Sequence, residues 1–435
     1  MKKVLFTSHT ANFQKFNHPF MKWFKQQGYE VHYASMGEEK VLHCDKHHTI
    51  CFSRSPFSVD NIKAYKPLKN IIDTEDYKII HTHTPMGAVV TRLAARKARK
   101  NGTKVIYTAH GFHFYKGAPL QNWAIYYPIE KLLSRYTDVL VTINTEDYNL
   151  AKKSMKAQQI VKINGVGIDL KKFKPVSNAK KLELRQQYGF SPNDLILICV
   201  AELNGNKNQE FLIKCIKDLS SKHPNIKLLL CGEGGFRKKY LQLIKEYNLE
   251  GNIHLLGYRK DIAKLMQLSD IGVSASFREG LPLNVLEELA TGLPVLASNN
   301  RGHKDIVNSI ELGYLYTTNN NKEFVDNFNI IINSNYIDLS QVRNKVTHKY
   351  SIAKAINSLQ PIYFSSNLSN AKDIYNSGQT LKPALNLQDQ AAFFSKLQDS
   401  QGSIRRIRRI VNEQNIDGGA YSDDQSQTTK WCKPN

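Results

Sequence analysis

The sequence predicts an α/β protein made of two doubly wound domains and a polar C-terminal extension. The chain has 435 residues, which is more than one hydrophobic core usually organises. Short runs of β-branched and aromatic residues alternate with longer amphipathic runs, and this is the pattern of parallel strands joined by helices. The alternation stops at a polar, lysine-rich stretch and then begins again. We therefore expect two domains of the same class.

The first domain is expected over residues 1–170. Strands are predicted at 4–7, 30–34, 79–81, 105–108, 139–143 and 160–163. Helices with apolar stripes are predicted at 17–27, 86–100, 120–136 and 146–155. Gly28 and Gly102 stand where two of these helices end, which is a common place for glycine.

A linker is expected at 171–190, within the polar stretch, and the second domain at 191–350. Its strands are predicted at 195–201, 226–231, 253–256, 271–274, 294–297 and 313–316. Its helices are predicted at 209–220, 237–247, 261–267, 283–290 and 322–332, and a closing helix is expected at 351–365.

The extension, 366–435, is rich in Ser, Asn, Gln and Asp, a composition that buries too little apolar surface to order itself fully. Within it, residues 403–411 place isoleucines on one helical face with arginines beside them. Such a helix could lie on an anionic membrane or dock on the protein's own surface, and the sequence leaves both interpretations open.

The six cysteines form no CxxC pair, which is typical of small core residues in a reducing compartment. The longest apolar run, 195–201, is far shorter than the roughly 18–20 residues of a membrane-spanning helix. The first residues lack the apolar core of a secretory signal. We therefore expect a cytoplasmic protein, with association at the inner face of the cell membrane left open.

The formal net charge is +22, and residues 1–174 alone carry 28 Lys and Arg against 13 Asp and Glu, a net +15. An electropositive domain favours phosphate-rich partners. Three such partners fit: an anionic membrane surface, a polyprenyl-diphosphate acceptor, or nucleic acid. A solvated basic surface without a specific partner is the alternative.

The most specific motif is a pair of glutamates, Glu279 and Glu287, separated by seven residues. The pair follows the predicted strand 271–274, and Pro282 between them suits the start of a helix. A loop at the carboxyl end of a parallel strand, leading into a helix, is where doubly wound folds bind phosphate-bearing ligands. One carboxylate can then face sugar hydroxyls while the other accepts hydrogen bonds from a ribose.

After the second glutamate the sequence runs EELATGLPVLAS over 287–298. Together with Glu279, this run resembles the signature of the retaining family 4 glycosyltransferases of the GT-B fold, in which two Rossmann-like domains face a cleft. Residues 164–169 (NGVGID), 232–234 (GEG) and 257–258 (GY) match further landmarks of that family in order and spacing.

Motifs in the first half resemble the subgroup of this family that makes capsular polysaccharides and exopolysaccharides. They are HTHTP at 81–85, TAHGFHFY at 108–115, NW at 122–123 and INTEDY at 143–148. The resemblance covers roughly residues 1–365 and leaves the extension unmatched.

The resemblance implies a nucleotide diphosphate sugar, most simply a UDP-sugar, as donor. Glu279 would orient the hydroxyls of the donor sugar, Glu287 would bind the ribose, and His110 would contact the sugar near the diphosphate. The family motif with an arginine and a lysine that grip the diphosphate reads AELNGNKN at 201–208, so Lys207 matches the lysine while Glu202 replaces the arginine. Further donor-binding residues are expected at Asn206, Gly280, Leu281, Gly232 and Gly234.

The departure at Glu202 leaves the charge of the diphosphate to Lys207 and helix N-terminal amides, with Asn206 and Arg278 as further candidates. An alternative is that Glu202 pairs with Lys207 in a purely structural contact. His110 likewise has the alternative of an imidazole satisfied by the backbone.

A metal site is considered at His81, His83, His110 and His113, but the carboxylate or cysteine ligands that would complete it are not evident. The chain contains no Asp-x-Asp motif. We therefore expect no metal cofactor.

The basic first domain favours a polyprenyl-diphosphate-linked or other glycan as acceptor, in cell-surface polysaccharide synthesis. Two other activities remain open from the sequence. One is a nucleotide-sugar 2-epimerase on the same fold. The other is nucleic-acid binding, which we do not expect because no aromatic and basic recognition module is apparent.

Overall fold

The structure is a computed structural model, and it describes residues 1–334 and 339–364. The predicted extension, 366–435, with its amphipathic run at 403–411, lies outside the described residues. Among the described residues, no helix is both long and apolar enough to cross a membrane.

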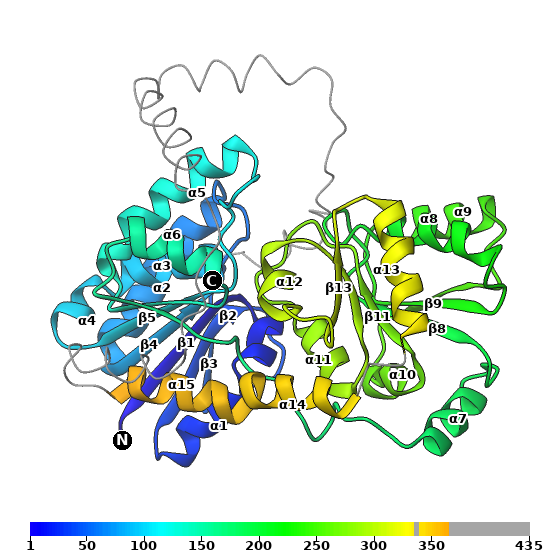
Figure 1. Cartoon of the computed structure of the whole chain (residues 1–435). Coiled ribbons are helices and arrows are strands. Elements are labelled where there is room, and N and C mark those ends of the chain that lie inside the picture. Colours follow the sequence, from blue (N-terminus) through cyan, green and yellow to red (C-terminus); the bar gives the residue numbers. More distant parts are fainter. Residues whose placement is uncertain (335–338, 365–435) are drawn as a thin grey trace. The chain divides into compact units, whose positions relative to one another are not determined.

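A parallel sheet of seven strands forms what we call the first lobe (Figure 1). The strands are β1 (Lys3–Thr10), β2 (Glu30–Met36), β3 (Lys46–Thr49), β4 (Tyr77–His83), β5 (Lys104–Ala109), β6 (Val139–Thr142) and β7 (Gln159–Lys162). Their order in the sheet is β3-β2-β1-β4-β5-β6-β7. All six strands predicted here form. The seventh, β3, was not predicted because its sequence, KHHT, contains no apolar residue.

A second parallel sheet, of six strands, forms the second lobe (Figure 1). The strands are β8 (Leu195–Val200), β9 (Ile226–Cys231), β10 (Ile253–Gly257), β11 (Ile271–Ser274), β12 (Val295–Ser298) and β13 (Gly313–Tyr316). Their order is β10-β9-β8-β11-β12-β13. All six were predicted, so the expected fold class of two doubly wound α/β units is confirmed.

Helices cover both faces of each sheet, as the alternation of buried residues requires. In the first lobe, Val4 and Phe6 on β1 face one core while Leu5 faces another. The first lobe contains α1 (His18–Gln26), α2 (Val59–Glu75), α3 (Pro85–Ala94), α4 (Arg96–Lys100), α5 (Leu120–Leu133) and α6 (Thr145–Ser154), with 3-10 turns at Ala11–Phe16 (η1) and Ser134–Tyr136 (η2). The second contains α7 (Asn178–Gln187), α8 (Gln209–Ser220), α9 (Arg237–Glu246), α10 (Ile262–Leu268), α11 (Leu283–Thr291), α12 (Arg301–Ile306) and α13 (Asn321–Asn333).

The last two described helices, α14 (Leu339–Tyr350) and α15 (Ile352–Phe364), belong to different lobes. Helix α14 packs against α11, whereas α15 packs against α1. Tyr363 of α15 lies 4.7 Å from Phe24 of α1, ring centroid to ring centroid. The helix expected at 351–365 therefore forms, and it brings the chain back to the first lobe.

Four helices were not predicted: α2, α7, α12 and α14. In α14, whose sequence is LSQVRNKVTHKY, polar and basic residues obscure the apolar period. Helix α2 contains Pro67 and many lysines, and its buried stripe is limited to Asn61, Ala64, Leu68 and Ile72. Helix α7 lies inside the expected linker, and of the residues in this helix only Leu184 and Arg185 are buried. Helix α12 is six residues long and contains a single aliphatic residue, so it shows no apolar period.

Both sheets reverse their strand order beside the first strand of the lobe. In the first lobe β1 lies between β2 and β4, and in the second lobe β8 lies between β9 and β11. Ligands of open α/β sheets bind outside the carboxyl ends of the strands at such a reversal. The ends of β1 and β4, and of β8 and β11, are therefore where a site is expected.

A buried ion pair between α3 and α5 gives a test of the first lobe. The Arg92 guanidinium donates to Glu130 at 2.8 Å, and the two side chains are 1% and 8% exposed. Replacing Glu130 with alanine leaves the guanidinium buried without its partner, so Glu130→Ala should lower the free energy of unfolding by about 3–5 kcal/mol in urea denaturation. Glu183→Ala, which removes an exposed partner of Lys180, should change it by less than about 1 kcal/mol. Equal effects would contradict the burial of the pair.

Candidate active site

Two loops of the second lobe meet at the strand-order reversal. The loop after β8 and the loop after β11 are joined by backbone and side-chain bonds: the Phe277 amide donates to the Asn206 carbonyl at 2.8 Å, and the Asn206 amide group donates to the Arg278 carbonyl at 3.1 Å. Lys207 then reaches Glu279, with its Nζ 2.6 Å from Oε1. The structure thus brings together Asn206, Lys207 and Glu279, as the sequence predicts.

Glu279 is a largely buried carboxylate that keeps its charge. Burial raises the pKa of its carboxyl, but the charges of Lys207 and His303 and the hydrogen bond from Lys207 outweigh burial and bring the pKa below its ordinary value. Lys207 pairs with Glu279. It does not pair with Glu202, whose side chain is exposed. The alternative pairing of Glu202 with Lys207 is wrong.

Glu287 differs from Glu279 in charge although both belong to one motif. It lies on α11 and is half-buried, and burial raises the pKa of its carboxyl to about 7, against the opposing charges of Lys172 and Lys15. The next residue, Glu288, is fully buried, and burial raises the pKa of its carboxyl well above the ordinary value. The helix therefore presents one glutamate that titrates near neutral pH and one that stays protonated in the core.

Glycines at two loop contacts allow neighbouring segments to approach closely. A Cβ on Gly280 would lie 2.0 Å from the carbonyl oxygen of His110, and a Cβ on Gly165 would lie 2.5 Å from Leu281. Gly280 and Leu281 thus meet the first-lobe loop at His110 and the loop after β7. The predicted residues Gly280, Leu281, Glu279 and His110 are therefore neighbours.

The predicted glycines Gly232 and Gly234 have a structural explanation of their own. Both have positive φ, and a Cβ on either would lie within 2.3 Å of a backbone carbonyl, of Ala201 for Gly232 and of Leu203 for Gly234. Only glycine fits such an approach without displacement. Their packing holds the loop after β9 against the loop after β8, and a contact with a donor stays a prediction.

Three histidines lie side by side at the carboxyl ends of β4 and β5. The His81 and His83 rings are 4.2 Å apart, and His83 Nδ1 is 3.0 Å from His110 Nε2. Burial lowers the pKa of His81 to about 3 and that of His110 to about 4, and it lowers the pKa of His83 well below the ordinary value. The row is therefore uncharged at neutral pH, and His110 is bonded to His83 instead of the backbone.

Metal ligation is the alternative use of such histidines. Among the described residues, the group whose ligand atoms lie within 4.8 Å of one another is a different one, His32, His48 and Glu75. Glu75 is already neutralised by Lys3 and Lys46, at 2.5 and 2.6 Å. Two lysines beside the carboxylate of this group disfavour a cation there, and we assign no metal site.

Two residues of this site, Arg301 and Asp147, were not predicted from the sequence. Arg301, the first residue of α12, is 8% exposed and bonds to the carbonyls of Glu279 and Phe112 and to the carboxylate of Asp147. Asp147 belongs to the INTEDY motif, which was the signal available in the sequence. The signal for Arg301 was weaker, because one arginine before a glycine resembles many surface turns.

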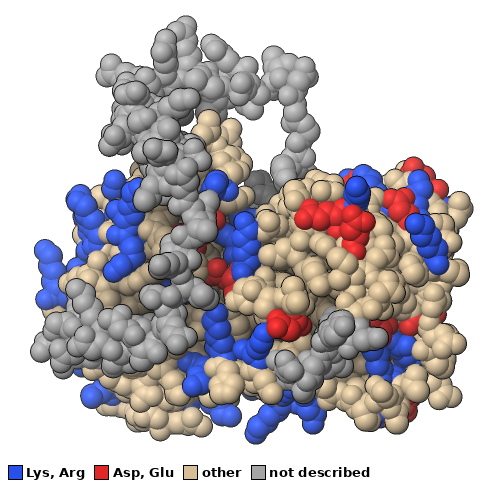
Figure 2. Space-filling view, viewed as in Figure 1, with Lys and Arg blue, Asp and Glu red and all other residues tan. Residues whose placement is uncertain are grey.

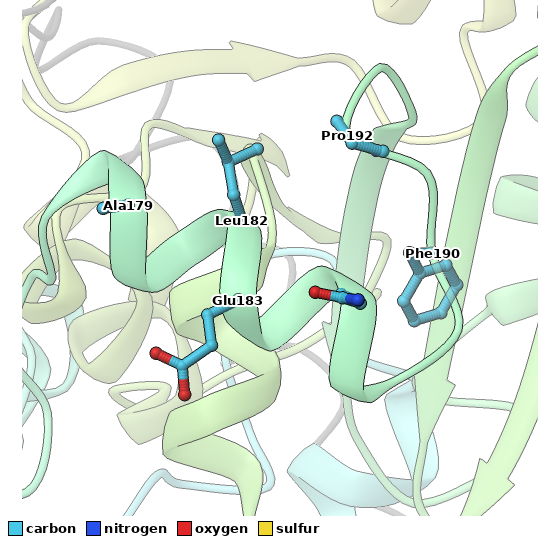
Figure 3. Close-up of a pocket in the computed structure, with 6 residues that line it drawn as sticks. Ala179, Leu182, Glu183, Phe190 and Pro192 are labelled. Atoms are coloured by element: carbon cyan, nitrogen blue, oxygen red, sulfur yellow. The ribbon is translucent and has the colours of Figure 1, made fainter.

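A hollow that includes none of these residues lies between α7 and the turn that carries Phe190 and Pro192 (Figure 3). Its charged residue, Glu183, is exposed and pairs with Lys180. The hollow therefore offers nothing that would bind a phosphate, and we place the candidate site at Glu279 and His110. On the face shown in Figure 2, Lys and Arg side chains spread over both lobes while Asp and Glu gather mainly over the second.

Comparison with known proteins assigns the chain to a family. Residues 3–144 match the family model described as glycosyl transferase 4-like, and residues 180–349 match the one described as glycosyl transferases group 1. The putative glycosyltransferase EpsD of Bacillus subtilis (strain 168) is 42% identical over 366 residues, which cover 83% of this chain and 96% of that protein. The chain belongs to the glycosyltransferases.

A second relative of this glycosyltransferase is the UDP-Gal:alpha-D-GlcNAc-diphosphoundecaprenol alpha-1,3-galactosyltransferase of Escherichia coli. It is 27% identical over 323 residues, covering 72% of this chain and 82% of that protein. Among solved structures, Anabaena Alr3699/HepE in complex with UDP and glucose has a TM-score of 0.70 at 18% identity, covering 83% of this chain and 99% of that one. This likeness confirms the GT-B fold. Of the activities left open by the sequence, family membership supports glycosyl transfer.

The contact between Gly280 and His110 gives a test of the glycosyltransferase's site. Gly280→Ala would place a methyl group against the His110 carbonyl, so one of the two loops must shift. We expect a loss of about 1–3 kcal/mol in the free energy of unfolding, as for other overpacked positions. Gly251→Ala is the matched control, because a Cβ there meets nothing within 4 Å. A Gly280→Ala protein as stable as the control would contradict the close approach.

Proposed function

We propose that this glycosyltransferase moves a sugar, with retention of anomeric configuration, from a UDP-sugar to a polyprenyl-diphosphate-linked glycan in cell-surface polysaccharide synthesis. The observation that carries the proposal is the ion pair of Lys207 with Glu279 at the strand-order reversal of the second lobe, with Glu287 on the helix that follows Glu279. A cation and two acidic groups of different pKa match the three parts of a nucleotide diphosphate sugar.

We assign each of the three side chains to a different part of the donor. Lys207 lies where a diphosphate would bind at the end of β8, and its bond to Glu279 would be shared with a phosphate oxygen. Glu279, ionised beside it, is suited to accept hydrogen bonds from sugar hydroxyls. Glu287 is suited to the ribose, because its carboxyl gains acceptor strength when it loses its proton near pH 7.

Transfer from such a donor is a task of positioning and charge stabilisation. The bond between the anomeric carbon and the diphosphate breaks, the acceptor oxygen bonds to that carbon, and the departing phosphate takes the acceptor proton. His110, kept neutral by burial, can donate a hydrogen bond to a sugar hydroxyl or to the phosphate without adding a charge. This mechanism needs no separate protein base, in line with front-face attack and retention.

The acceptor and donor classes rest on the relatives together with the charge. The name of the E. coli relative specifies a UDP-sugar donor and an undecaprenol-diphosphate-linked acceptor. The net +15 of residues 1–174 favours an acceptor that carries a diphosphate and lies at an anionic membrane surface. We therefore place the enzyme on the cytoplasmic side of the cell membrane. We expect it to work without a metal cofactor, since the cationic Lys207 stands beside the site.

A panel of nucleotide sugars read by thermal unfolding tests the proposed donor site. UDP and one UDP-sugar should stabilise the wild type, by about 2.7 kcal/mol at a ligand concentration of 100 Kd. Glu287→Ala should lose most of that stabilisation, because the ribose contact is removed. The control Glu246→Ala changes an exposed glutamate of α9 and should respond like the wild type. Equal stabilisation of all three proteins would refute the role of Glu287.

The raised pKa of Glu287 predicts how binding depends on pH. Below about pH 7 the carboxyl is protonated. Above that pH the carboxylate is available to accept hydrogen bonds from the ribose hydroxyls. UDP affinity should therefore rise by about tenfold from pH 6 to pH 8 through this group. Since UDP itself ionises in that range, the measured quantity is the ratio of wild-type to Glu287→Gln affinity by calorimetry. A ratio that stays constant would show that Glu287 does not titrate in contact with the nucleotide.

A further inference from the structure

Arg301 is a buried arginine whose hydrogen bonds are divided between the two lobes. Its Nε donates to the Glu279 carbonyl at 3.3 Å, within the second lobe. Its Nη2 donates to the Phe112 carbonyl at 2.7 Å, and its Nη1 donates to the Asp147 carboxylate, both in the first lobe. The guanidinium also lies over the ring of Tyr115, 4.7 Å from the centroid. One side chain thus touches the residue that we assign to the donor sugar and the loop that carries His110.

Asp147 completes this arrangement from the first lobe. It is 0% exposed and lies in the first turn of α6, where Asn144 caps the helix by accepting from its amide. Its Oδ2 accepts from the Phe112 amide at 2.9 Å and from the Asn144 side chain at 2.8 Å, leaving Oδ1 for Arg301. Burial raises the pKa of this carboxyl, while Arg301, the Phe112 amide and Asn144 favour its charged form.

The two charged groups hold Phe112 by both of its peptide groups, the amide through Asp147 and the carbonyl through Arg301. His110 stands two residues earlier, and its carbonyl faces Gly280. Gly111 between them has a φ of +136°, and a Cβ there would lie 3.3 Å from the Arg301 guanidinium and from the Gly280 Cα. The position of His110 therefore follows from where Arg301 and Asp147 hold Phe112.

We propose that Arg301 and Asp147 are positioning residues that align His110 with Glu279 when the lobes are together. The inference rests on the proposed function, in which His110 and Glu279 both face the donor sugar. Arg301 acts through these two residues, since each of its three nitrogens donates to a protein acceptor. Asp147 supplies the buried countercharge that keeps the guanidinium in place.

A second contact between the lobes provides a matched control. Asp305, also on α12, accepts from the Thr145 amide at 2.7 Å and pairs with Lys162 at 3.7 Å. Lys162 is 31% exposed and has no bond to Phe112 or Glu279 among the described residues. Lys162→Ala removes a charge between the lobes without touching the His110 loop.

The experiment compares Arg301→Lys, Asp147→Asn, their double variant and Lys162→Ala. Two quantities are measured for each: the Kd for UDP, and the kcat for release of UDP from the UDP-sugar that stabilises the wild type most, with water as the acceptor. Arg301→Lys keeps a cation near Asp147 but loses the planar fork, so misalignment should lower kcat by about 100-fold while the Kd for UDP is unchanged. Asp147→Asn should lower kcat by a similar factor. The kcat of the double variant should be no lower than that of either single variant. Lys162→Ala should have the kcat and the Kd of the wild type.

Hydrogen exchange of residues 110–115 gives a readout that does not depend on turnover. Both single variants should exchange faster there, and Lys162→Ala should not. A wild-type kcat and wild-type exchange in Arg301→Lys would overturn the inference. An equal loss in UDP affinity and kcat would also overturn it, since Arg301 would then bind the diphosphate itself. A wild type that neither binds UDP nor releases it from any UDP-sugar would instead refute the proposed function.

Discussion

A single ion pair, between Lys207 and Glu279, underlies the proposed donor site of this glycosyltransferase. Glu279 is largely buried, and a carboxyl in such surroundings would normally take up a proton. The ammonium group of Lys207, 2.6 Å away, keeps it ionised. The two residues come from loops that follow neighbouring strands, β8 and β11, so the reversal of strand order is what brings the charges together. An anion that bound to Lys207 would therefore also weaken the interaction that keeps Glu279 ionised.

Helix α11 shows how one element gives neighbouring glutamates opposite properties. Glu287 and Glu288 are adjacent in sequence, and a helix turns by about 100° between successive residues. Glu287 consequently lies toward Lys172 and Lys15, where its carboxyl titrates near neutral pH. Glu288 turns into the core, where a Cβ on Gly272 would lie 2.4 Å from its carboxyl oxygen. Gly272 makes room for a protonated glutamate in a position that an aliphatic side chain usually fills.

Periodicity predicted every described strand except β3, because these strands carry the β-branched and other apolar residues that are typical of parallel sheets. It failed for β3, which is polar, and for α2, where Pro67 and the lysines obscure a narrow stripe. Within the candidate site, Glu279, Lys207 and His110 were identifiable from motifs. Asp147 lies in the INTEDY motif, but its pairing with Arg301 was not predicted. The contact spans 154 residues of chain, and no local pattern indicates which acceptor a buried arginine will find.

The hydroxyl of Tyr363 bonds to His81 Nδ1 at 2.8 Å, across 282 residues of sequence. Tyr363 lies on α15, after the entire second lobe, yet it supports the first member of the histidine row that ends at His110. The first lobe is therefore not a self-contained module: residues 1–170 alone would lack the helix that covers α1 and the phenol that orients this row. During synthesis on the ribosome, the histidine row of the first lobe can be completed only after residue 363 has emerged.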